Sequence, residues 1–127
     1  MFPAWHIALT SFITAVLTAA LAGVTLVLRR SEPTQQASSL RAGQQILDAL
    51  VVGLVAGLGV LLWRLGANIP ALNDDPIPGV SPADVLSGPV AFVAVGVYTG
   101  LRGASERWAS AQALAAIVAL VVNIVTI

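Results

Sequence analysis

Four stretches of the chain are apolar over the length that is needed to cross a lipid bilayer. A transmembrane helix needs roughly 20 mostly apolar residues, because the hydrocarbon core of a bilayer is about 30 Å thick. The predicted spans cover residues 7–28, 46–65, 84–101 and 108–127, with a connecting loop at about 66–83. We therefore expect an all-α membrane protein, in which four transmembrane helices form two hairpins within a single domain of residues 1–127.

The composition supports this expectation and excludes several other classes of protein. Hydrophobic residues make up 57% of the chain and charged residues only 9%, whereas a soluble domain carries about 25% charged residues. The net charge is zero, so a nucleic-acid partner is not expected. Cysteine is absent, which removes disulfides, iron–sulfur clusters and thiol nucleophiles from consideration.

The distribution of arginine predicts how the chain is oriented in the membrane. Cytoplasmic connectors carry an excess of Arg and Lys, and here the first and third connectors are basic while the middle one is acidic. The basic connectors carry Arg29, Arg30, Arg41, Arg102 and Arg107, and the middle one carries Arg64 with Asp74, Asp75 and Asp84. We expect both basic connectors to be cytoplasmic, and both termini and the acidic loop to lie outside a prokaryotic plasma membrane.

The first apolar run is interpreted as a retained helix rather than a cleaved signal peptide. No Lys or Arg precedes it, and it is longer than the apolar part of a signal peptide, which is about 7–15 residues. Arg29 and Arg30, which follow it, resemble the flank of a stop-transfer segment.

The end of the middle loop carries the signals of a helix start. Ser81 is a favoured N-cap, Pro82 suits the first helical position, and Asp84 completes a capping box. Pro89 falls about two turns inside the same span, where a proline removes a backbone hydrogen bond. We expect a kink near Pro89; the alternative is a helix that restarts there, with Ser87 as its cap.

Small and hydroxyl-bearing residues mark the expected helix-packing faces. Gly53 and Gly57 in the second span, and Gly96 and Gly100 in the third, have the four-residue spacing that lets two backbones approach closely. Thr14 and Thr18 belong to a hydroxyl-bearing stripe on the first span. These faces either pack within the bundle or contact other subunits or a pigment.

Three further places carry candidate binding groups. His6, beside Trp5, could act as the axial ligand of a heme or a chlorophyll-type pigment on which Trp5 packs; the alternative is a polar interfacial residue next to its aromatic anchor. Asp74 and Asp75 either face water or dock against a partner, and two adjacent carboxylates are too few for a calcium site. Asn123 is expected to hydrogen-bond to a neighbouring helix.

The sequence therefore favours a structural rather than a catalytic role. No ionisable residue lies at the centre of a span, and no catalytic motif is present, so independent catalysis is not expected. We expect a small accessory subunit of a larger prokaryotic membrane complex, respiratory or photosynthetic, with other membrane subunits and lipids as partners. The alternative is a homo-oligomeric channel, holin-like pore or small transporter, whose path is lined by the hydroxyl stripe.

Overall fold

The described parts of the chain form four long helices and one helix of a single turn. The computed structural model describes residues 2–28, 38–74, 76–103 and 107–126. The helices are α1 (Ala4–Leu28), α2 (Ser38–Gly66), α3 (Pro70–Asn73), α4 (Pro82–Leu101) and α5 (Arg107–Val125). Within these described ranges there is no strand, only an isolated bridge between Ile77 and Val80. The predicted all-α fold with four long helices is confirmed.

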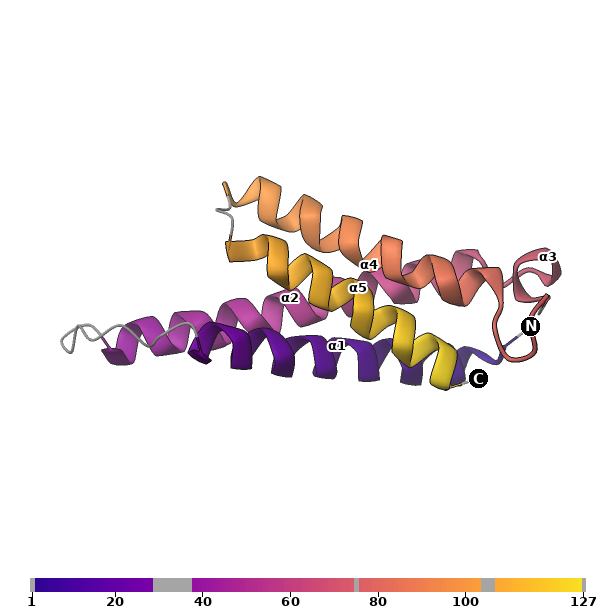
Figure 1. Ribbon diagram of the computed structural model, residues 1–127, viewed down its shortest axis with the longest axis horizontal. Helices are drawn as coiled ribbons and strands as arrows, with labels where there is room; N and C mark the ends of the chain where they lie inside the picture. Colours follow the sequence, from indigo (N-terminus) through magenta and orange to yellow (C-terminus); the bar gives the residue numbers. More distant parts are fainter. Residues whose placement is uncertain (1, 29–37, 75, 104–106, 127) are drawn as a thin grey trace.

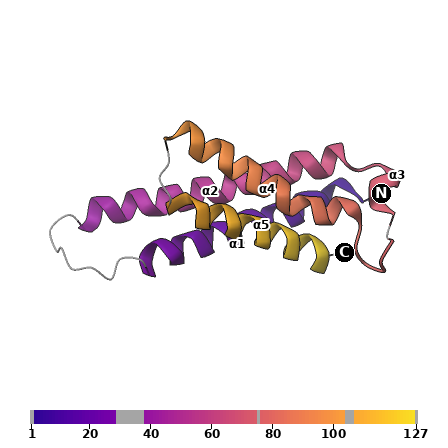
Figure 2. The same cartoon turned by 45° about the horizontal axis from the view of Figure 1, so that its top comes forward.

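The long helices form two antiparallel hairpins that lie side by side (Figures 1 and 2). One hairpin consists of α1 and α2, and the other of α4 and α5. The bundle is closed because α2 packs against α4 and α1 packs against α5. Both chain termini lie at one end of the bundle together with α3, and we call this the termini end (Figure 1). The last residues of α1 and α4 and the first residues of α2 and α5 lie at the opposite end.

The helices have the length and the surface of membrane spans. Three of them contain apolar segments long enough to cross a bilayer, namely Ala4–Thr25, Gly43–Gly66 and Pro82–Leu101, and α5 contains a shorter one, Ala109–Val125. Large apolar side chains such as Leu58 project outward from the bundle, where a soluble protein would carry polar groups. The protein is therefore a four-helix, multi-pass membrane protein.

The second helix is longer than its predicted span. It begins at Ser38 rather than near residue 46, because the polar residues before the apolar segment also adopt helical structure. Hydropathy identifies the part of a helix that prefers lipid, and it does not identify a polar extension of the same helix.

The backbones of α1 and α2 lie unusually close to each other at two glycines. A Cβ atom added to Gly53 would lie 2.4 Å from the carbonyl oxygen of Ala15, and one added to Gly57 would lie 2.6 Å from the Cβ of Ala15. Both distances are shorter than any real Cβ contact, so only glycine fits without a shift of the helices. Close backbone approach of this kind increases van der Waals contact, on which helix association in lipid depends.

The interior of the bundle is built from alanine and valine rather than from large side chains. The buried cluster joins three helices and consists of Val52, Ala56, Val60, Ala91, Val95, Ala111, Ala115 and Ala119. The helix α1 contributes hydroxyl side chains to the interior in addition to Ile7 and Ala22. Small side chains allow the helices to pack closely without the hydrophobic driving force that acts in water.

The start of α4 agrees with the local sequence signals. Ser81 is the N-cap of the helix, Pro82 is at its first position, and Ser81 and Asp84 form the capping box. This part of the prediction is confirmed. The helix runs without interruption through Pro89, so the alternative of a restart at Ser87 is wrong; a bend at Pro89 stays a prediction.

The close approach of α1 and α2 gives a testable prediction. We expect Gly53→Ala to lower the free energy of unfolding by about 1–3 kcal/mol, because the added methyl group overpacks the contact with α1. The measurement is reversible unfolding in mixed detergent micelles. Gly100→Ala is the matched control, since no atom lies within 4 Å of a Cβ added there, and we expect it to stay within about 1 kcal/mol of the wild type. Equal stability of the two variants would contradict the packing role of Gly53.

Candidate functional site

A buried ion pair joins the two hairpins at the termini end of the bundle. Arg64 lies in the last turn of α2 and Asp84 in the first turn of α4. The Arg64 Nη1 group donates a hydrogen bond to Asp84 Oδ1, and the two side chains are only 2% and 0% exposed. Because a charge without a partner is costly in a medium of low dielectric constant, the two residues depend on each other.

The carboxylate of Asp84 is also bonded to the residue that caps its own helix. Asp84 Oδ2 accepts the backbone N–H of Ser81 at 2.9 Å and also the Ser81 hydroxyl. One carboxylate therefore completes the capping box and neutralises Arg64. Its negative charge also lies at the positive end of the helix dipole of α4, which is favourable.

Two further hydrogen bonds hold α4 in place beside the ion pair. The indole N–H of Trp63 donates to the backbone carbonyl of Ala83 at 3.0 Å, which ties α2 to α4. The Ser87 hydroxyl lies 2.5 Å from the carbonyl oxygen of Asp84 and 3.1 Å from that of Ala119, which ties α4 to α5. The first turns of α4 are thus bonded to both of the helices that flank them.

The N-terminal segment covers the ion pair. The guanidinium carbon of Arg64 lies 4.8 Å from the ring centroid of Phe2, within the range of a cation–π contact. The backbone N–H of Phe2 donates to Asn68 Oδ1, and Asn68 Nδ2 donates to the Phe2 carbonyl, both at 3.0 Å. The side chain of Asn68 therefore fixes the segment over the end of α2.

His6 is held in place by the same segment and by the end of α5. Its Nε2 lies 2.7 Å from the carbonyl oxygen of Thr126, so this nitrogen carries the proton and donates it to the bond. The ring stacks on Phe2, with centroids 5.4 Å apart, and meets Trp5 edge-on at 5.6 Å. Its Nδ1 is buried and has no hydrogen-bond partner in the described part of the chain.

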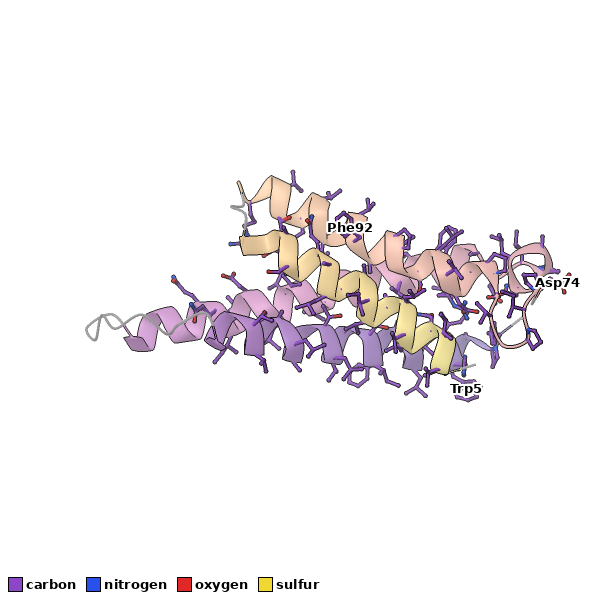
Figure 3. All side chains as sticks on the ribbon, in the orientation of Figure 1. Trp5, Asp74 and Phe92 are labelled. Atoms are coloured by element: carbon purple, nitrogen blue, oxygen red, sulfur yellow. The ribbon has the colours of Figure 1, made fainter. Side chains whose placement is uncertain are left out.

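This arrangement does not favour His6 as a ligand of a macrocycle. One ring nitrogen is occupied by Thr126, and the other has no accessible surface through which a bulky pigment could approach. The Trp5 side chain is 66% exposed and projects from the end of α1 away from the bundle (Figure 3). This exposed position suits an interfacial anchor, the alternative that the sequence left open for this pair, and a pigment at His6 stays a prediction.

The hydroxyl stripe of α1 faces the inside of the bundle. Thr14 and Thr18 are both fully buried. Thr14 Oγ1 donates to the Thr10 carbonyl at 2.9 Å, while Thr18 Oγ1 has no partner among the described residues. The stripe is thus enclosed by one chain rather than presented to other subunits.

The prediction for Asn123 is wrong. Its Nδ2 donates at 2.8 Å to the carbonyl of Ala119, which belongs to the same helix, and its Oδ1 is buried with no partner in the described ranges. An amide side chain can reach the carbonyl one turn earlier in its own helix as readily as it can reach a neighbouring helix. The sequence does not distinguish these two acceptors.

The two glycine pairs have different surroundings. Gly53 and Gly57 lie against α1, as described above. A Cβ atom added to Gly96 would lie 2.5 Å from Nε2 of Gln112 on α5, and the space around Gly100 is open. Gly53, Gly57 and Gly96 thus serve contacts within the chain, whereas Gly100 lies at the surface of α4.

The acidic loop extends beyond the ends of the helices. Asp74 caps the C-terminus of α3 and is exposed at the outermost part of the termini end (Figure 3). Asp75 lies outside the described residues, as do the side chains of Arg107 and Trp108. Among the residues whose positions are described, no three His, Asp or Glu side chains come together in a way that could hold a metal ion.

Sequence reasoning missed the pairing of Arg64 with Asp84, although a signal for it was present. Arg64 is the one basic residue of the otherwise acidic middle connector. An arginine at the end of an apolar span either extends its side chain to the interface or pairs with a carboxylate, and Asp84 begins the next span.

Comparisons of the chain with protein-family models, with curated proteins and with solved structures find no match.

The mutual dependence of the two charges can be measured by a double-mutant cycle. We expect Arg64→Met and Asp84→Asn each to lower the free energy of unfolding by about 3–5 kcal/mol, because each leaves a buried group without its partner. The double variant should be more stable than the sum of the single losses predicts, by about 0.5–3 kcal/mol.

The control for this cycle is Arg102→Met. The Arg102 guanidinium lies over the ring of Tyr98 at 5.5 Å but is exposed, so we expect a loss of no more than about 1 kcal/mol. Strictly additive losses in the cycle would contradict the coupling of Arg64 and Asp84.

Proposed function

We propose that this protein is a small structural subunit of a larger prokaryotic membrane complex, in which it fills an interface and positions lipids or neighbouring chains. The observation that carries the proposal is the division between its surface and its interior. Large apolar side chains cover the outside of all four long helices, whereas the buried hydroxyl, amide and charged groups are enclosed within the bundle. Such a surface offers apolar contacts to other membrane helices and to lipids.

The acidic loop is the part of the chain that we propose for docking against a partner outside the membrane. Asn73 Nδ2 donates to the carbonyls of Ala67 at 3.1 Å and Ile69 at 2.8 Å, so the start of the loop is internally bonded. A turn follows, in which the Val80 N–H donates to the Ile77 carbonyl at 2.9 Å and Gly79 has a φ of 77°. The described segments on either side of residue 75 are thus internally bonded, and they carry the exposed groups Asp74 and Ile77. Internal bonding of a docking segment lowers the entropic cost of binding.

We further propose that the termini end faces the outside of a prokaryotic plasma membrane. The excess of arginine in the first and third connectors supports this orientation. The positions of the helix ends support it as well. The last residues of α1 and α4 and the first residues of α2 and α5, which flank the two basic connectors, all lie at the end of the bundle opposite the termini (Figure 1).

The alternative, a homo-oligomeric pore or small transporter, has less support from the positions of the hydroxyl groups. A pore between subunits needs polar side chains on the outer face of each chain. Thr14 and Thr18 are instead buried inside one chain.

Purification of the native complex tests the proposed role. We expect the chain to be recovered from its native membrane in a mild detergent together with at least one other membrane protein in fixed stoichiometry. A variant with Asp74→Arg and Ile77→Arg should lose this partner, because both exchanges alter the docking surface. Val97→Leu, an exchange on the exposed face of α4, should retain it. Recovery of the chain alone under these conditions would contradict the proposal.

The orientation is tested separately by labelling of introduced cysteines, since the natural chain has none. In intact cells we expect a membrane-impermeant maleimide to label Asp74→Cys, and to label Ser31→Cys only after the membrane is permeabilised. The opposite pattern would show that the chain is inserted the other way round.

A further inference from the structure

An apolar groove runs along the surface of the bundle between α2 and α4, below the ion pair. It has a volume of about 410 Å³ and is lined by Trp63, Leu86, Pro89, Val90, Val93 and Ala94. The end of the groove that is nearer the ion pair lies beside the hydrogen bond between Trp63 and the Ala83 carbonyl. This position is about one turn inside the start of α4. The groove therefore begins near the membrane interface and extends toward the middle of the bilayer.

Pro89 leaves a backbone acceptor without its usual partner at this groove. In a helix the carbonyl of Val85 accepts the N–H of the residue four positions later, which here is Pro89. Proline has no N–H, so this bond is missing although the helix continues through the residue. A helical carbonyl points toward the C-terminal end of its helix, so the Val85 oxygen is directed toward the proline that lines the groove.

Two side-chain donors at the start of α4 and at the groove are bonded to other groups. The Ser87 hydroxyl lies between the carbonyls of Asp84 and Ala119, and the indole N–H of Trp63 is bonded to the Ala83 carbonyl. A carbonyl that faces lipid without a donor is unfavourable, because the hydrocarbon contains no water. A ligand that brings its own donor gains a hydrogen bond at this position.

We propose that the groove between α2 and α4 binds a lipid that carries a hydroxyl group, with its chain along Pro89, Val90 and Val93 and its hydroxyl donating to the Val85 carbonyl. The apolar lining suits an acyl or isoprenoid chain. The acceptor lies near the interface, at the depth where the hydroxyl groups of lipids are found. The inference does not rest on the subunit role, since failure of lipid binding would leave co-purification with a partner unchanged.

The test compares two probes with the same chain, one with hydrogen-bond donors in its headgroup and one without. The first is a monoacylglycerol with a dibrominated chain, and the second is the same lipid with both hydroxyl groups converted to methyl ethers. Bromine quenches the fluorescence of a nearby tryptophan, so Trp63 reports occupancy in a Trp5→Phe/Trp108→Phe background. The detergent is an amine oxide, which has no donor of its own. We expect the monoacylglycerol to bind about two- to tenfold more tightly than its ether, as one hydrogen bond allows.

Two proline variants then identify the acceptor. Pro89→Ala restores the N–H that bonds Val85 and favours the helix, so it should abolish the preference for the hydroxyl probe. Pro82→Ala is the matched control, because Pro82 is at the first helical position, where no intrahelical partner for the N–H is required. It should leave the preference unchanged. Val93→Phe, which places a larger side chain in the groove, should weaken the binding of both probes.

Several results would overturn the proposal. Equal binding of the two probes would mean that the Val85 carbonyl is satisfied in another way. A preference that persists in Pro89→Ala would place the acceptor elsewhere. Failure of both probes to quench Trp63 would mean that the groove is covered, for example by a second copy of the chain.

Discussion

The ion pair between Arg64 and Asp84 connects the two halves of this bundle, and the surrounding structure at the termini end is arranged around it. The chain passes from one hairpin to the other only through the loop between α2 and α4, so the relative position of the hairpins depends on how these two helix ends are joined. The pair joins these two ends, and Ser81, Trp63 and Phe2 satisfy or cover the groups next to it. Removal of either charge would leave the other buried without a partner, which is costly.

The remaining contacts follow from the absence of water between membrane helices. Burial of large apolar groups gives little advantage in lipid, and contact area has to come from the close approach of backbones. Gly53 and Gly57 provide it between α1 and α2, and the alanines of α5 provide it against α2 and α4. The hydroxyl groups of Thr14 and Ser87 bond to backbone carbonyls, so these polar atoms are buried without charged partners.

The parts of this structure that were predictable from sequence are the local ones. Apolar runs identified the four long helices, and the order of Ser81, Pro82 and Asp84 identified the start of α4. The bond of Asn123 and the partner of Arg64 were not predictable in this way. The amide of Asn123 can reach acceptors on its own helix and on a neighbouring helix, and it bonds to its own. The partner of Arg64 lies 20 positions away in the sequence, on a helix of the other hairpin. The role of His6 likewise depends on the carbonyl of Thr126 at the other end of the chain.

The length of α2 also has a consequence for the surrounding bilayer. Its 29 residues, Ser38–Gly66, correspond to about 44 Å at 1.5 Å per residue, which is longer than the hydrocarbon layer of about 30 Å. A helix of this length fits the bilayer only if it tilts or if one of its ends extends beyond the hydrocarbon. Because Arg41, Gln44 and Gln45 are near its start, the extension falls at the end of the bundle opposite the termini, where this helix carries polar groups into the lipid headgroup region.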